Sequence, residues 1–533
     1  MIRRWRGGAL FALVALAGAL LLTRGLVAQP GYTDAYYYFN AAERLVRGDG
    51  LTDAYLWTYL AEPDSLPAPS HLYWMPITSL LAALGMWLAG APGDYAAAQW
   101  PFTLALAGAS GVAYWLGGRI GGTARHRWVA GLITLSGGFY ARFWGMTDAF
   151  APFALIGALA LVCAGLGLRY LHDGDSPWRA WRWWALAGAL AALGHLTRAD
   201  GLLLLLAGIA ALLWPWDWPR IEPKQRRTKL VALLALIAAY LLVMSPWLLR
   251  NLQVAGSPLP AGGLNAIWYT EYDDLFRYPP GVSPDEFFAD GLQALWSTRW
   301  TAFSNNLGTF VAIEGLIAMT PLMLVGLWRR RRDPFLRAFW LYALGLHLAM
   351  TFVFPLPGYR GGLLHSAVAL IPWWAALGVA GLDDVVMAIA RRRQSWKPRQ
   401  AQRVFSVGLV LLALALSWSI GTANRVAAGT PGHYPQLAAL LPDSARVMIN
   451  DPAQLYYFTG LGGVVTPNAE PDAIPQIARR YGVTHLLIEY TGRGDSLTLA
   501  VPQRLAFDLD APPPYLTEIP FESSGMRLYV INP

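Results

Sequence analysis

Twelve apolar stretches, each about as long as a membrane-spanning helix, limit what this chain can fold into. A helix that crosses a bilayer needs roughly 20 mostly apolar residues, because only a helix satisfies its own backbone hydrogen bonds in lipid. The stretches run approximately over residues 7–28, 72–90, 95–118, 128–142, 148–170, 183–197, 200–215, 229–249, 307–328, 335–354, 362–381 and 403–421. Only 14% of the 533 residues are charged, whereas soluble domains have roughly 25%. The sequence therefore predicts a polytopic α-helical membrane protein.

Short basic loops predict the orientation of the chain, since loops rich in Lys and Arg stay in the cytoplasm. Five such loops lie at residues 119–127, 169–182, 220–229, 329–332 and 391–403. All five fall on one side of the membrane if the stretches from residue 95 onward cross in turn. This clustering also accounts for the net charge of +8, so we expect no nucleic-acid partner.

The basic N-terminus shares that side only if one of the first three stretches does not cross. We choose residues 72–90, which contain Pro76, and expect them to lie along the outer interface. About eleven crossings remain, with the N-terminus in the cytoplasm and the C-terminus outside a cell (plasma or inner) membrane. A signal peptide cleaved near Ala28 is the alternative for the first stretch, but Leu26 fits the small-residue rule for cleavage poorly.

This topology divides the chain into a transmembrane domain, residues 1–421, and an external domain, residues 422–533. The transmembrane domain has external loops at about 29–94 and 250–306. The external domain has strand-like runs and one helical stretch, at residues 445–450, 485–489, 527–531 and 474–481. This mixture predicts a small α/β module. The chain has one cysteine, Cys163, so no intrachain disulfide can form.

Ionisable side chains collect at the helix ends and loops that this topology places outside. They are Asp34, Asp53, His71, Arg142, Asp148, His195, Arg198, Asp200, Arg250, Arg360 and His365. Acids lie in the earlier external segments and arginines in the later ones, so together they can hold an anion beside a base. Ionisable groups near a membrane core are costly unless they are paired or hydrated. A lipid phosphate is their natural counter-ion.

Most of these residues also have a structural interpretation. Asp34 and Asp148 precede helical runs, so either can cap a helix N-terminus. Arg198 and Asp200 can form a local ion pair that closes a tight turn, and His195 can pack between helices. The two later arginines of the set can anchor the helix ends among lipid headgroups. The joint distribution of the acids and arginines is what favours a functional site.

Several short motifs add a resemblance to a known family. They are GYTDAYYYF at residues 31–39, the acidic turn 142–148, TRADG at 197–201, PWLLRN at 246–251, Asp451, YYFTG at 456–460 and RYGV at 480–483. As a set they resemble the GT-C glycosyltransferase superfamily, and in particular glycosyltransferase family 39, which includes protein O-mannosyltransferases and lipid A aminoarabinose transferases. Many relatives have an Asp-Glu pair in the first loop, where this chain has Asp34-Ala35. Asp53 is a candidate substitute for the second acid.

The resemblance implies transfer of a sugar from a polyprenyl-phosphate carrier to a hydroxyl group on the extracytoplasmic side, with inversion at the anomeric carbon. The acceptor is a glycan, a lipid or a protein. Asp34 and Asp148 are then the catalytic candidates, with Asp34 as the base. The donor phosphate is expected at Arg198, Arg250, Arg360 and His365. A divalent metal ion is a candidate cofactor, with Asp34, Asp148 and His71 as its candidate ligands.

Two other classes of function compete with a transferase. A transporter or flippase could move a lipid-linked sugar through the same basic chamber, and a noncatalytic envelope-assembly protein could use the helices as an anchor. The sequence has no detectable internal repeat, and its polar residues gather at one face instead of the midplane expected of an alternating-access site. About eleven crossings also exceed what an anchor needs. We therefore expect a glycosyltransferase.

Overall fold

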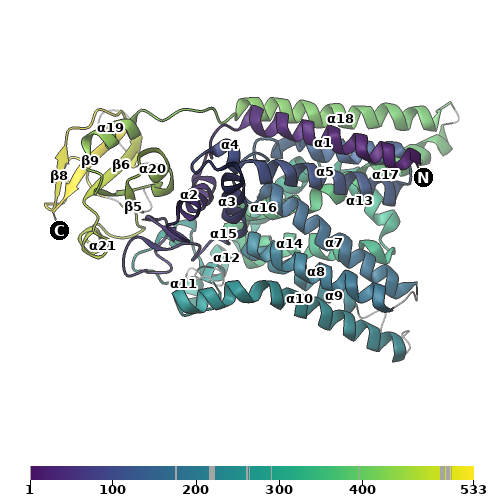
Figure 1. Cartoon of the computed structure of the whole chain (residues 1–533), viewed down its shortest axis with the longest axis horizontal. Helices are drawn as coiled ribbons and strands as arrows, with labels where there is room; N and C mark the ends of the chain where they lie inside the picture. Colours follow the sequence, from purple (N-terminus) through teal and green to yellow (C-terminus); the bar gives the residue numbers. More distant parts are fainter. Residues whose placement is uncertain are drawn as a thin grey trace.

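A bundle of long helices carries a small α/β domain at one end (Figure 1). The computed structural model describes residues 2–173, 177–214, 223–259, 262, 265–289, 291–393, 395–491, 498–499, 505 and 507–532. The longer helices of the bundle are α1 (Ile2–Leu26), α5 (Trp100–Gly121), α6 (Ala124–Ser136), α7 (Phe150–His172), α8 (Pro177–Thr197), α9 (Leu202–Leu212), α10 (Pro223–Ala255), α13 (Thr320–Arg330), α14 (Arg337–Leu348), α17 (Ile371–Arg392) and α18 (Pro398–Ala423). Each of the twelve apolar stretches contains a helix, which confirms the predicted class.

Six helical segments among the described residues are long and apolar enough to cross a membrane. They are Arg6–Leu26, Phe150–His172, Arg226–Ala255, Pro334–Val353, Pro355–Arg392 and Pro398–Ala423. Other bundle helices, such as α5, are rich in small residues, which lower the hydropathy but allow close packing. A Cβ atom on Gly117 of α5 would lie 2.3 Å from the carbonyl oxygen of His126 in α6. The number of eleven crossings stays a prediction.

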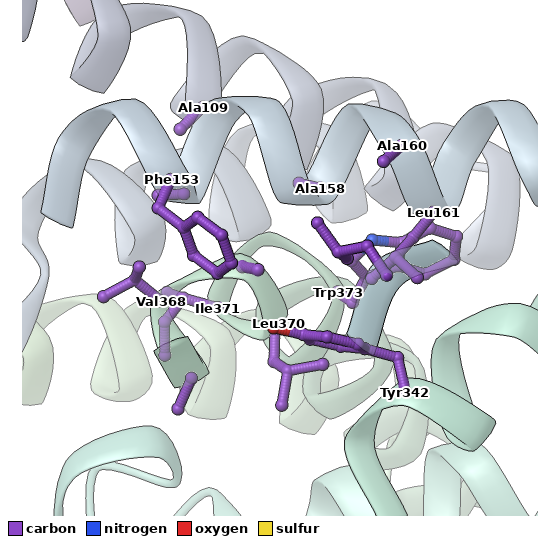
Figure 2. Packing of buried hydrophobic residues seen from close by; sticks show 14 of the residues in the cluster. Ala109, Phe153, Ala158, Ala160, Leu161, Tyr342, Val368, Leu370, Ile371 and Trp373 are labelled. Atoms are coloured by element: carbon purple, nitrogen blue, oxygen red, sulfur yellow. The ribbon is translucent and has the colours of Figure 1, made fainter. Parts of the chain in front are cut away.

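The buried core of the bundle lies where α7 packs against the segment that leads into α17. Figure 2 shows Phe153, Ala158 and Leu161 of α7 on one side and Leu370 and Trp373 on the other. Trp373 is fully buried. Such interdigitated packing holds the helices rigidly, so the turns at their ends have fixed positions.

Further elements connect the bundle helices or interrupt them. They are η1 (Gly138–Tyr140), η2 (Ala199–Gly201), η4 (Asn265–Trp268), η5 (Tyr272–Phe276), α11 (Pro284–Ala289), α12 (Gly291–Gly308), η6 (Thr309–Glu314), η7 (Pro334–Leu336), η8 (Ala349–Val353), α15 (Pro355–Pro357), η9 (Gly358–Gly362), α16 (Leu363–Ala367) and η10 (Val368–Leu370). Inside η9, Gly361 has a φ of 133°, a value that residues with a side chain rarely adopt. This break lets the chain turn before α16.

The segment between α1 and α5, which includes the predicted first external loop, forms a layer over the end of the bundle. It contains α2 (Thr33–Arg47), β1 (Thr52–Asp53), β2 (Tyr55–Leu56), β3 (Ala68–Pro69), α3 (Ile77–Ala89) and α4 (Tyr95–Ala98). Strands β1 and β3 pair antiparallel. In Figure 1, α3 lies next to α2 and runs across the direction of the long helices. This position agrees with the interfacial helix predicted for residues 72–90.

The C-terminal domain is built on a mixed sheet. Its elements are α19 (His433–Leu440), β4 (Arg446–Ile449), α20 (Pro452–Thr459), β5 (Gly462–Val465), α21 (Ala473–Tyr481), β6 (His485–Thr491), β7 (Thr498–Leu499), β8 (Leu516–Ile519) and β9 (Met526–Ile531). The strand order is β2-β5-β4-β6-β9-β8, with β7 paired to β6. Strand β4 runs parallel to β5 and β6, with Val447 opposite Gly463, and β9 runs antiparallel to β6. Strand β2 from the first external loop pairs parallel with β5, which joins the loop to this domain.

Candidate active site

Three segments far apart in the sequence bring Asp34, Asp148 and His365 together. Asp34 lies in the first turn of α2, Asp148 in the turn before α7, and His365 in α16. One potential ligand atom from each residue lies within 4.8 Å of the other two. The structure thus unites three of the residues that the sequence singled out.

Asp34 does not cap its helix. The N-cap position of α2 is Tyr32, which makes no side-chain cap, so the capping interpretation of Asp34 is wrong. No side chain within the described ranges hydrogen-bonds to the Asp34 carboxyl group. Burial raises the pKa of Asp34, and the positive charge of Arg198, or of His365 when its ring is protonated, opposes this shift. A carboxyl group with a raised pKa is a better proton acceptor than an ordinary aspartate.

Asp148 both supports its turn and faces the site. One carboxylate oxygen, Oδ1, accepts a hydrogen bond from the backbone N–H of Ala149 at 2.5 Å. The other, Oδ2, lies 3.1 Å from Nε2 of His365. The N-cap of α7 is Ala149 and has no side-chain cap, so the capping interpretation of Asp148 is wrong. Its first oxygen supports the turn, and its second faces His365.

His365 points Nε2 of its ring toward Asp148. Its Nδ1 lies 2.8 Å from the carbonyl oxygen of Gly361, which can only accept, so Nδ1 carries the proton. In the neutral ring Nε2 is then unprotonated, and Tyr32 can donate its hydroxyl to it over 3.3 Å. The imidazole also stacks on Phe150, with the ring centroids 4.1 Å apart. This packing fixes the direction of Nε2.

Arg198 lies next to this group and is held through one nitrogen. Its Nε donates to Oδ1 of Asp200 and to Oγ of Ser366, both at 3.0 Å, and Ser366 donates to the other oxygen of Asp200. The ion pair expected within the TRADG turn therefore exists. The two terminal nitrogens of Arg198 make no hydrogen bond to the part of the chain that the structure describes, so they can bind an anion.

Arg250, Asp53 and His71 form a separate cluster around Tyr37. Tyr37 donates its hydroxyl to Asp53 over 2.9 Å and accepts from the backbone N–H of His71. Arg250 donates to the carbonyl oxygen of Ser70 over 2.6 Å. Burial raises the pKa of Asp53 to about 7 and lowers that of His71 to about 3. Arg250 thus binds the loop backbone, and this cluster holds the first external loop against α10.

His71 does not lie beside Asp34 and Asp148, and its ring has a structural role. Its ring is fully buried, and its nitrogens lie 2.7 Å from Ser70 Oγ and 2.9 Å from Ser79 Oγ. Both ring nitrogens are therefore satisfied by hydroxyl groups. His365 occupies the place beside Asp34 and Asp148 that the sequence analysis gave to His71.

The remaining candidates lie outside the group around Asp34. Arg142 donates to Oδ1 of Asn424 at 3.0 Å. His195 is buried, with Nδ1 2.5 Å from the Tyr240 hydroxyl, so it packs between α8 and α10. Arg360 is exposed, and its guanidinium lies 5.0 Å from the ring centre of Tyr272.

Sequence reasoning missed three groups that complete the site. Tyr32 and the carbonyl of Gly361 contact His365, and Ser366 links Arg198 to Asp200. The only signal in the sequence was their position: Tyr32 is two residues from Asp34, and Ser366 follows His365 directly. Serine and tyrosine are too common in external loops for this signal to identify them.

Solved structures of other membrane proteins resemble this chain, although sequence comparison finds no relative. No family model and no curated protein matches the sequence. The oligosaccharyltransferase of Archaeoglobus fulgidus, in a structure with a tethered acceptor peptide, superposes with a TM-score of 0.59 at 14% identity over 90% of this chain and 69% of that chain. ArnT from Cupriavidus metallidurans, bound to undecaprenyl phosphate, superposes with a TM-score of 0.54 at 16% identity over 98% and 97% of the two chains.

The chain has the GT-C fold. The two superpositions cover 90% and 98% of this chain, so the predicted resemblance is confirmed for its fold. Two further structures of the archaeal GT-C enzyme are also similar: AglB with an inhibitory peptide and a dolichol-phosphate, at a TM-score of 0.55 and 12% identity over 92% of this chain and 74% of that chain, and the complex with Zn and sulfate, at 0.57 and 14% over 90% and 67%.

Proposed function

We propose that this chain is a membrane glycosyltransferase that moves a sugar from a polyprenyl-phosphate carrier to an acceptor hydroxyl group on the extracytoplasmic side. The observation that carries the proposal is the meeting of Asp34, Asp148 and His365 beside Arg198, whose charge acts on Asp34. A base lies here beside a guanidinium whose terminal nitrogens make no hydrogen bond to the described residues, and these two groups match the two charges that develop during this transfer. The GT-C neighbours with dolichol-phosphate and undecaprenyl phosphate support this class of donor.

In the proposed reaction the acceptor oxygen attacks the anomeric carbon of the donor. Asp34 takes the proton of the acceptor hydroxyl as the new carbon–oxygen bond forms. The bond between the anomeric carbon and the phosphate oxygen breaks, and its electron pair stays on the polyprenyl phosphate. The terminal nitrogens of Arg198 stabilise this leaving group, because a guanidinium can donate two parallel hydrogen bonds to a phosphate. Attack opposite the leaving group inverts the anomeric centre.

A divalent metal ion fits the same three residues. Nε2 of His365 and Oδ2 of Asp148 lie 3.1 Å apart, yet both are electron-pair donors when His365 is neutral and Asp148 is ionised. A proton or a cation must lie between them. Two carboxylates and one imidazole nitrogen are suitable ligands for Mn²⁺ or Zn²⁺, and the similar oligosaccharyltransferase was solved with Zn. When bound, such an ion supplies positive charge that neutralises the donor phosphate.

The arrangement of the chain supports an extracytoplasmic site in a cell membrane. The N-terminus lies at the end of the bundle opposite the C-terminal domain (Figure 1). Arg125 pairs with Asp383 at 2.5 Å and Arg330 with Asp384 at 2.6 Å, so two of the basic loops lie against the same part of α17. Under the positive-inside rule this is the cytoplasmic end. We therefore place residues 1–421 in the membrane domain and 422–533 outside.

Release of undecaprenyl phosphate tests the proposed function. The purified chain in lipid nanodiscs is incubated with a panel of undecaprenyl-phosphate hexoses and pentoses that carry a radiolabelled sugar. We expect release of free carrier with at least one donor, and no release with Asp34→Asn. Flipping of a fluorescent donor across liposomes without any release would instead identify a flippase and refute the transferase.

A further inference from the structure

The helix that carries Asp34 has a second face, and that face is bound to the C-terminal domain. Thr33, Tyr36 and Asn40 follow the spacing of one helix face, whereas Asp34 and Tyr38 lie on a neighbouring face. Tyr36 packs against Tyr457 and Phe458 of α20, with ring centroids 4.9 and 5.7 Å apart. The amide of Asn40, which is 1% exposed, donates to the carbonyl oxygen of Ala453 at 2.8 Å.

Asp451 makes the contact nearest to the active site. Its Oδ2 accepts a hydrogen bond of 2.6 Å from the hydroxyl of Thr33, the residue before Asp34. Its Oδ1 accepts from the backbone N–H of Gln454 at 3.0 Å and so caps α20. One carboxylate therefore joins the first turn of α2 to the first turn of α20.

The position of Asp451 in the domain makes this contact informative. It lies at the carboxyl end of β4, which is flanked by the parallel strands β5 and β6. In α/β sheets the crevice at the carboxyl ends of such strands is where functional groups collect. Here the N-terminus of α2 reaches this edge, and pairing of β2 with β5 fixes the same loop a second time.

We infer that Asp451 is a positioning residue, which holds Asp34 in place through Thr33 and makes the C-terminal domain part of the active site. This inference rests on the proposed function. Because Tyr32 provides no side-chain cap, the hydrogen bond from Thr33 to Asp451 supports the start of α2, and its loss should loosen the first turn. A displacement of about 1 Å at a reacting group can reduce a rate by roughly 100-fold.

Paired variants of the full-length protein in nanodiscs test the link. The Asp451 carboxylate uses one oxygen for Thr33 and the other for Gln454, and Asp451→Asn leaves only one oxygen that can accept. Thr33→Val removes the donating hydroxyl at nearly constant shape. With the undecaprenyl-phosphate donor that the wild type uses, we expect each variant to lower kcat by about 10- to 100-fold and to leave KM for the donor unchanged. The double variant should be no slower than the slower single variant, since both remove one interaction. Thr33→Ser, which keeps the donor hydroxyl, should restore kcat.

The matched control is Asp510→Asn, which removes an exposed carboxylate that contacts Arg527 in the same domain. It should leave kcat unchanged. Normal kcat in both single variants, or losses that add in the double variant, would overturn the inference while the transferase function stands.

Hydrogen–deuterium exchange provides a measurement that does not depend on turnover. Amides in peptides that cover residues 33–39 should exchange faster in Asp451→Asn and Thr33→Val than in the wild type or Asp510→Asn. Unchanged exchange would refute the positioning role even in an active enzyme. A wild type that releases no carrier from any donor would refute the proposed function, and the exchange result would still decide whether Asp451 fixes α2.

Discussion

Nε2 of His365 lies 3.1 Å from Oδ2 of Asp148, although 217 residues separate the two in sequence. The contact depends on the break at Gly361, whose carbonyl oxygen accepts a hydrogen bond from Nδ1–H of His365. A ring bound in this way cannot donate from Nε2 unless it is protonated. The pair therefore needs a positive charge at its centre, and this requirement makes the site testable without its substrate.

Removal of either partner should weaken binding of a divalent ion. We expect Asp148→Asn and His365→Ala to reduce the affinity for Mn²⁺ by at least about 10-fold, since loss of even a group behind a metal ligand has an effect of that size. Titration with Mn²⁺, followed by electron paramagnetic resonance, measures the affinity. His172→Ala changes an exposed histidine at the other end of α7 and should bind Mn²⁺ like the wild type. Equal affinities in all four proteins would exclude a metal site here.

Asp34→Asn should reduce sugar transfer by about 100- to 10,000-fold, the usual contribution of a general base. The amide cannot accept the acceptor's proton, but it has nearly the same shape as the carboxyl group. Binding of undecaprenyl phosphate, measured by native mass spectrometry, should change little because Arg198 is intact. Asp64→Asn, at an exposed position of the same loop, is the control. Full transfer by Asp34→Asn would eliminate this residue as the base.

The helical bundle was predictable because its signal is local. Runs of apolar residues report membrane helices directly, and each of the twelve runs contains a helix. The partner of β2 was not predictable, because Tyr55 and Leu56 pair with Gly463 and Val464 across about 400 residues. Two residues form too short a strand to carry a pattern of their own.

The members of the site were easier to predict than their grouping. We predicted Asp34, Asp148, Arg198 and His365 from their charge at helix ends expected outside the membrane. Such groups are costly near lipid unless they are paired or hydrated, so they mark functional sites. The same argument selected His71, and only the structure shows that two serine hydroxyls satisfy its ring. A sequence does not reveal which polar partners the fold supplies.

Arg198→Lys tests the proposed phosphate clamp. The guanidinium uses Nε for Asp200 and Ser366, which leaves its other nitrogens for the phosphate, whereas one ammonium group cannot do both. Dissociation constants for undecaprenyl phosphate should rise about 10- to 100-fold, as expected for the loss of a charged hydrogen bond. Arg480→Lys, which alters an exposed ion pair with Glu62, should have no effect. An unchanged constant in Arg198→Lys would remove this residue from the donor site.

Asp53 should make the stability of the fold depend on pH. Burial raises its pKa to about 7 against the attraction of Arg44 and Arg250 and the hydrogen bond from Tyr37, whereas an unfolded aspartate has a pKa of about 3.9. Between these values the folded state binds the proton more tightly than the unfolded state, so stability falls as the pH rises. Asp53→Asn keeps an acceptor for Tyr37 and cannot ionise.

The test is to measure the melting temperatures of Asp53→Asn and the wild type in detergent from pH 4 to pH 8. The difference between the two temperatures reports the effect of ionising Asp53. The two proteins should melt alike near pH 4, where Asp53 is protonated in the folded state. The variant should gain progressively as the pH approaches 7 and keep its advantage above it, since only the wild type then buries a charge. Asp64→Asn, an exposed change in the same loop, should show no such trend. A constant difference across the whole range would mean that Asp53 is ionised in the fold at every pH tested.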